Sequence, residues 1–163
     1  MALSVTSLDP QTARLLEPRA PTPSRRLEAV EKLSEAGIYV HVNIAPVVPG
    51  ITDHEIEAIV AAAAQRGARS ISFIPMRLLH EVAPLFEQWL ENHYPDRKAK
   101  VMSIVRQIRG GRRNDPAFHS RMRGQGPWAE LIRTRLAIAA RKAGLQKAKL
   151  ALRTDLFRRP LIR

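Results

Sequence analysis

The order of segments in the first 80 residues constrains the fold most strongly, because short β-branched runs alternate there with longer helix-like stretches. Val, Ile and Thr gather in three runs bounded by proline or glycine, which is typical of strands. Strands are therefore expected over residues 3–8, 38–45 and 68–74. Successive strands joined by helices of this length are expected to be parallel, with right-handed crossings. The sequence thus predicts an α/β sheet.

Two helices are expected between these strands. Ser24 is a suitable cap for the first helix, and Gly37 is suited to end it. Residues 52–55 read Thr-Asp-His-Glu, which has the capping-box pattern, so the second helix is expected to begin there and to end at Gly67.

Each expected strand has one apolar face and one face of small or polar side chains, because side chains alternate along a strand. A sheet covered by helices on both sides would be apolar almost throughout, and a filled eight-stranded barrel would have bulky inner residues. The pattern therefore favours a barrel-like sheet whose polar inner face holds a ligand. A sheet with a solvated face is the alternative, which the crossover helices disfavour. The polar faces carry Ser4, Thr6, His41, Asn43, Ala45, Ser70 and Ser72.

The remainder of the chain is expected to be helical and is strongly basic. Residues 1–96 have a net charge of −4, whereas residues 97–163 have a net charge of +16. We expect residues 1–80 to form the α/β part and residues 81–163 a basic helical extension packed on it. Such asymmetry favours a polyanion partner, DNA or RNA first, with solubility or docking on an acidic protein as the alternative.

Several classes of protein are excluded by composition. The 163 residues contain no cysteine, which excludes disulfides, zinc–thiolate sites and any iron–sulfur cluster held by this chain's own thiolates. The histidines lie at no recognisable metal-binding spacing. The longest apolar run has seven residues, far short of the roughly 20 that span a bilayer. No membrane association and no secretory signal are predicted, so a cytoplasmic location is expected.

Candidate ligand contacts lie just after the expected strands. Arg19, in the first such loop, is suited to pair bidentately with a carboxylate or phosphate, although a surface pair with Glu17 is equally open. Asn43 and Ala45 precede a stiff turn at residues 46–50. Asn43 is suited to bond a ribose hydroxyl, and a simple shaped connector is the alternative.

An anion site is also expected in the basic part. Residues 121–128 combine two arginines, two glycines and a helix start, where free N–H groups and guanidinium groups favour an anion. The candidate nucleic-acid or anion contacts are Arg112, Arg113, Arg121 and Arg123.

Four stretches, in their order and spacing, resemble the second half of a radical S-adenosylmethionine protein related to spore-type DNA repair photolyases. They are residues 4–9 (SVTSLD), 16–20 (LEPRA), 45–50 (APVVPG) followed by 52–55 (TDHE), and 121–124 (RMRG). The resemblance runs from about residue 1 to 157. It implies the C-terminal part of a partial (β/α)₆ TIM-like barrel, a [4Fe–4S] cluster with bound S-adenosylmethionine, and hydrogen abstraction by a 5′-deoxyadenosyl radical.

The same resemblance implies roles for individual residues. Ser4 or Thr6 would face the ribose and methionine part of S-adenosylmethionine. Arg19 would take its carboxylate, while Asn43 and Ala45 would flank the ribose and adenine. In the related photolyases the substrate is damaged DNA, with which the basic second part is compatible.

The chain departs from this family in two respects. The family ligates its cluster with a Cys-x-x-x-Cys-x-x-Cys loop after the first barrel strand, whereas this chain has no cysteine and is expected to lack the first three strands. We therefore expect a C-terminal fragment, inactive alone, completed by a missing N-terminal half or a partner chain. A non-catalytic nucleic-acid-binding module and an interaction subunit that pairs through an exposed strand edge are the alternatives.

Overall fold

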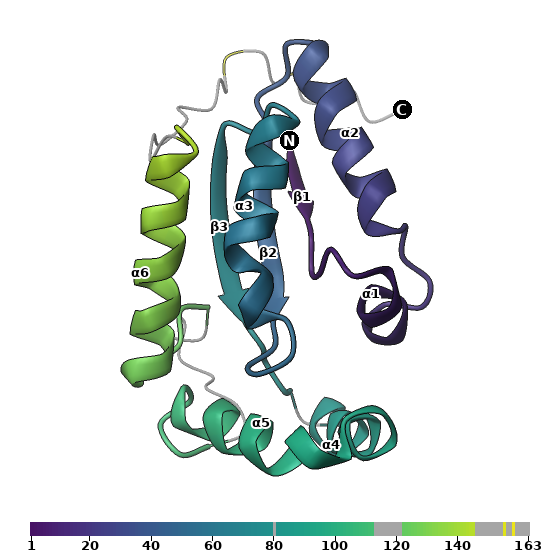
Figure 1. Ribbon diagram of the computed structural model, residues 1–163, viewed down its shortest axis with the longest axis vertical. Helices are drawn as coiled ribbons and strands as arrows, with labels where there is room; N and C mark the ends of the chain where they lie inside the picture. Colours follow the sequence, from purple (N-terminus) through teal and green to yellow (C-terminus); the bar gives the residue numbers. More distant parts are fainter. Residues whose placement is uncertain (80, 113–121, 146–154, 156–157, 159–163) are drawn as a thin grey trace.

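The computed structural model describes residues 1–79, 81–112 and 122–145, together with Asp155 and Arg158 (Figure 1). Its centre is a three-stranded parallel sheet in the order β1-β2-β3. The strands are β1 (Ala2–Ser4), β2 (His41–Val47) and β3 (Ser70–Pro75). The predicted parallel α/β sheet is confirmed. Three strands do not close a barrel, so membership of a barrel stays a prediction.

Six α-helices lie in the described ranges. They are α1 (Pro10–Leu16), α2 (Pro23–Glu35), α3 (Ile56–Gln65), α4 (Val82–His93), α5 (Pro95–Gln107) and α6 (Gly126–Lys142), and a 3₁₀ turn η1 (Asp53–Glu55) precedes α3. Figure 1 shows α3 in front of the sheet, with α2 and α6 on either side of it. Among the residues described, no helix has both the length and the apolar character needed to cross a membrane.

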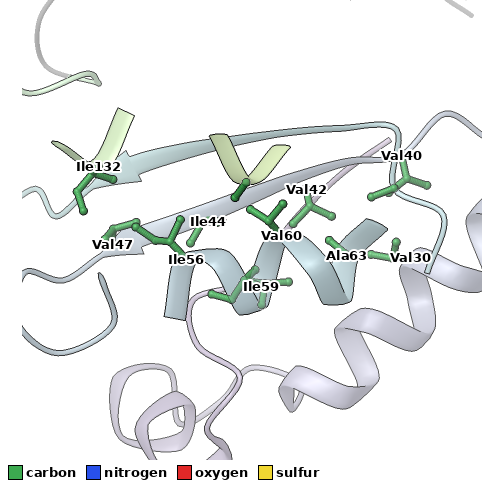
Figure 2. Close-up of a cluster of buried hydrophobic side chains, with 13 residues drawn as sticks. Val30, Val40, Val42, Ile44, Val47, Ile56, Ile59, Val60, Ala63 and Ile132 are labelled. Atoms are coloured by element: carbon green, nitrogen blue, oxygen red, sulfur yellow. The ribbon is translucent and has the colours of Figure 1, made fainter. Parts of the chain in front are cut away.

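The main core lies between the sheet and the layer formed by α2, α3 and α6. The alternation along the central strand turns Val40, Val42 and Ile44 toward this layer, and all three are fully buried (Figure 2). Ile59 of α3 and Ile132 of α6 pack against them. The helices therefore cover one face of the sheet, as the apolar pattern predicts.

A second apolar cluster lies near the carboxyl ends of β2 and β3. Val48 and Leu78 pack there against Phe86 and Leu90 of α4 and Val101 of α5. In Figure 1 the α4–α5 pair lies below the arrowheads of these strands. This pair therefore supports the edge of the sheet from which the loops after β2 and β3 leave.

The first two strands have different ends from those predicted. The first strand stops at Ser4, because Ser7 and Leu8 bond to a side chain instead of a neighbouring strand. The second strand begins at His41, because the Ile38 amide bonds to the Leu33 carbonyl and completes the end of α2.

Helix starts were also predicted incompletely. Helix α2 begins at Pro23, after Thr22 rather than after Ser24. Residues 10–16, for which no helix is among the two expected between the strands, form α1, since the Asp9 carboxylate accepts hydrogen bonds from the Gln11 and Thr12 amides. A carboxylate at this position satisfies amides that have no partner within the helix.

We predict that Ile44→Ala lowers the free energy of unfolding by about 2–5 kcal/mol, because it leaves a cavity beneath α3. The measurement is urea denaturation followed by circular dichroism. The matched control is Ile38→Ala, since Ile38 is 42% exposed. Equal losses for the two variants would contradict the position of this core.

Candidate functional site

A chain of polar side chains crosses the face of the sheet opposite the main core. The His41 ring lies between two serines of β3, with Nδ1 2.8 Å from Ser70 Oγ and Nε2 2.8 Å from Ser72 Oγ. Ser72 Oγ donates to Asn43 Oδ1 at 3.0 Å. Strand register produces this row, because His41 pairs with Ser70 and Asn43 with Ser72.

The direction of the hydrogen bonds in this row follows from the single hydroxyl proton of Ser72. That proton goes to Asn43, so His41 Nε2–H donates to Ser72 Oγ. Nδ1 then accepts from the Ser70 hydroxyl. All the hydrogen bonds of this row form with a neutral imidazole. Since the described residues give Asn43 Nδ2 no partner, this N–H group remains able to donate to a ligand.

Burial lowers the pKa of His41, and the nearby positive N-terminal amine lowers it further. Both effects favour the neutral ring, which agrees with the bonding just described. His41 therefore contributes hydrogen bonds rather than charge at neutral pH, and the whole row is uncharged.

A carboxylate organises the carboxyl end of β1. Glu17 Oε2 accepts from Thr6 Oγ1 at 2.7 Å and from Arg26 Nη2 at 2.8 Å. Arg26 Nη1 also donates to the Ser4 carbonyl (2.9 Å) and to Ser4 Oγ (3.1 Å). Val5 bonds to β2, so the Ser4 carbonyl points away from β2, along the outer edge of the sheet.

Glu55 fixes the loop that follows β1. Its side chain is largely buried, and it accepts from Ser7 Oγ at 2.7 Å and from the amides of Leu8 and Asp9. The predicted capping box is wrong here, because Thr52 Oγ1 accepts from the Val48 amide instead. Tertiary partners thus replace the local bonds that the motif predicts.

Arg109 holds the end of β3. The residue is 3% exposed, and its Nη2 donates to the carbonyls of Pro75 at 3.0 Å and Met76 at 2.8 Å. The sequence does not reveal this role, because an arginine in a basic segment predicts a surface position.

The predicted site residues occupy different surroundings. Ser4 and Asn43 lie on the polar face of the sheet, on adjacent strands. Thr6 is 2% exposed and lies within hydrogen-bonding distance of Glu17 and the Ala45 carbonyl, so its hydroxyl is used inside the protein. Arg19 is exposed and has no ion-pair partner among the described residues, because Glu17 pairs with Arg26.

The four arginines predicted to contact nucleic acid are only partly described. Arg112 and Arg123 are exposed, whereas Arg113 and Arg121 lie outside the described residues. The Arg133 guanidinium approaches the carbonyls of Arg123 and Gly124 at 3.4 Å. An anion site formed by these arginines stays a prediction.

The two implied cofactors differ in how they fit this chain. An iron–sulfur cluster does not fit, since the sequence offers no thiolate and the described residues contain no group of three His, Asp or Glu that could hold a metal ion. The polar face is chemically compatible with a nucleoside. It offers neutral donors and acceptors, among them the unused Nδ2 of Asn43, and these suit ribose hydroxyls and a base.

The sequence of the first 63 residues matches a known superfamily. The profile of the Radical SAM superfamily matches residues 1–63, which include β1, β2 and most of α3. This segment is similar to the radical SAM superfamily. The matched segment contains Ser4, Thr6, Arg19, Asn43 and Ala45.

Curated relatives cover a longer stretch. The uncharacterized proteins Rv2578c of Mycobacterium tuberculosis and Mb2609c of Mycobacterium bovis are each 28% identical over 108 residues, which is 65% of this chain and 32% of the relative. The uncharacterized protein ORF301 of Acidianus two-tailed virus is 41% identical over 49 residues, 30% of this chain and 16% of the relative. The chain spans about a third of the length of the mycobacterial relatives. No solved structure matches.

We predict that His41 makes the stability of the fold depend on pH. Its pKa is lower in the folded protein than the usual value of about 6.5, so the unfolded chain takes up the proton first as the pH falls. The stabilisation that results from this pKa difference is complete above about pH 6.5 and is lost as the pH falls toward the lower pKa of His41 in the folded protein. In urea denaturation at several pH values, His41→Gln should show a shallower decline over that window. An unchanged decline would contradict this assignment.

We predict that Glu55→Ala frees the loop after β1, because Ser7 and the amides of Leu8 and Asp9 lose their shared acceptor. Loss of a buried acceptor costs about 1–3 kcal/mol. Amide hydrogen exchange should accelerate at Leu8 and Asp9. The control is Glu57→Ala, which breaks an ion pair with Arg135 farther along the same segment and should leave these two amides protected. Equal acceleration of exchange in both variants would contradict the role of Glu55 in holding this loop.

Proposed function

We propose that this chain forms the S-adenosylmethionine-binding, C-terminal part of a radical S-adenosylmethionine enzyme related to spore-type photolyases. The observation that carries the proposal is the neutral polar face of β1–β3, with the helices packed on the other side. Most of this face belongs to the segment that matches the superfamily, residues 1–63. The match supports the superfamily, and the narrower relationship rests on the sequence motifs.

Each contact proposed for the ligand uses a group that can still form a further hydrogen bond or ion pair. Asn43 donates its Nδ2–H to a ribose hydroxyl, and the Ser4 hydroxyl donates beside it. Arg19, exposed and without an ion pair in the described part of the chain, takes the ligand carboxylate. Thr6 acts indirectly, because its single hydroxyl proton is directed to Glu17, with the Ala45 carbonyl of β2 as the other acceptor within reach.

The cluster is proposed to come from outside this chain. Together with an iron–sulfur cluster, bound S-adenosylmethionine supplies radical hydrogen abstraction from a substrate. The thiolates would belong to an N-terminal half of the barrel or to a partner chain, since this sequence has none. This chain alone is therefore proposed to bind and orient the adenosyl group without catalysing the reaction.

The test is direct binding of S-adenosylmethionine to the 163-residue chain, measured by equilibrium dialysis and by NMR. We expect shifts at the amides of Asn43 and Ser72. Asn43→Ala should weaken binding about 2- to 10-fold, which corresponds to one lost hydrogen bond of about 0.5–1.5 kcal/mol.

The matched control for this test is Asn92→Ala, since Asn92 is an exposed amide of α4 that bonds only to Gln88 among the described residues. It should leave the affinity unchanged. Shifts confined to the helical side of the sheet, or equal effects of the two variants, would refute the proposed site.

A further inference from the structure

A basic groove lies between η1, α5 and α6, with a volume of about 510 Å³. It shares no lining residue with the polar face of the sheet, so it is separate from the site proposed above. The side chains that matter are His54, Arg97, Lys100, Trp128, Leu131 and Arg135. The groove therefore combines positive charge with an aromatic ring and an aliphatic wall.

Two exposed cations of α5 line one side of this groove. Arg97 and Lys100 lie about one helical turn apart, so both reach the same side of α5. Arg97 Nη1 donates to the Gly50 carbonyl at 3.0 Å, and its guanidinium lies 6.0 Å from the centroid of the Tyr94 ring. Lys100 has no ion pair with any described residue. Neither charge is neutralised by a carboxylate in the described part of the chain.

Two acidic groups lie in or beside the groove, and among the residues described only Glu57 is paired with a cation. Asp53 accepts from the Gly50 amide at 2.9 Å and from Trp128 Nε1 at 3.1 Å. Glu57 binds Arg135 through two hydrogen bonds, of 2.6 and 2.7 Å. Arg135 therefore contributes little net charge. Within the described ranges, Asp53 bonds only to neutral N–H groups and keeps its negative charge, which offsets one of the two cations of α5, so that Arg97 and Lys100 together still leave the groove with a net positive charge.

The indole of Trp128 is held at a fixed orientation beside these cations. Its N–H is anchored on Asp53, while the ring lines the groove next to Leu131, which is 55% exposed. A fixed aromatic ring next to two cations is the combination by which proteins bind single strands, with bases stacked and phosphates paired.

We propose that this groove binds a segment of single-stranded nucleic acid, with phosphates on Arg97 and Lys100 and a base against Trp128. The net charge of +16 over residues 97–163 favours the approach of such a polyanion. An acidic peptide would also be attracted to the cations, but it would leave the anchored indole without a stacking partner. The single strand uses both features.

The first experiment isolates the fluorescence of Trp128. The chain has two tryptophans, so Trp89→Phe leaves Trp128 as the only one. Titration of this variant with oligothymidylate should quench the fluorescence, since a base stacks on the indole. In Trp128→Phe the remaining Trp89 should not be quenched. Absence of quenching in the first variant, or equal quenching in both, would overturn the proposal.

The second experiment measures affinity by the fluorescence anisotropy of a labelled oligothymidylate. Arg97→Ala with Lys100→Ala should lower the affinity about tenfold or more at low salt. It should also make the slope of log K against log salt shallower by about 1.4, because single strands give about 0.7 per phosphate contact. The matched control is Arg25→Ala with Lys32→Ala on α2, which removes the same charge from an exposed helix.

Three outcomes would overturn the proposal that this groove binds single-stranded nucleic acid. They are equal losses in the two double variants, displacement of the oligonucleotide by polyglutamate of equal charge at equal concentration, and no measurable binding. S-adenosylmethionine affinity provides a separate readout, because Arg97→Ala with Lys100→Ala should leave it unchanged. Failure of one proposal is therefore distinguishable from failure of the other.

Discussion

The opposite chemistry of the two faces of β2 determines the arrangement of the whole molecule. Val42 and Ile44 draw α3 and α6 onto one face, where burial of apolar surface supplies the main stabilisation. His41 and Asn43, which alternate with them in sequence, point to the other face and bond to β3. Because the period of a strand is two residues, a one-residue shift in the register of β2 would exchange its two faces. The same strand of seven residues therefore contributes to both the core and the candidate site.

Two carboxylates from different elements fix the end of the sheet where a ligand is proposed to bind. Glu17 follows α1 and bonds to Thr6, whereas Glu55 precedes α3 and bonds to the loop at Ser7. The start of the loop after β1 is therefore held by contacts from two different elements, so its shape is set before any ligand arrives. Such preorganisation reduces the ordering that binding would otherwise require.

Local patterns predicted the order of the strands, their parallel direction and the residues of each face, because periodicity and turn residues are local signals. They did not predict the partners of Thr52 and Glu55, since the capping-box pattern looks the same whether its side chains bond within the helix or to a distant loop. Arg109 was missed for the same reason, because its acceptors lie more than 30 residues earlier in the chain. The groove at Trp128 likewise depends on elements that meet only in the folded chain.

The Arg26 guanidinium on the outward Ser4 carbonyl has a consequence for how this molecule meets others. Free carbonyls along a sheet edge invite indiscriminate pairing with any extended peptide, which leads to aggregation. Here a cation that is itself paired with Glu17 occupies that position. An incoming polypeptide must displace the Arg26 guanidinium and break its hydrogen bonds before it can add a strand to this edge. Nonspecific pairing of extended peptides with this edge is thereby disfavoured. A polypeptide can pair with β1 only if its other contacts compensate for the loss of the Arg26 hydrogen bonds.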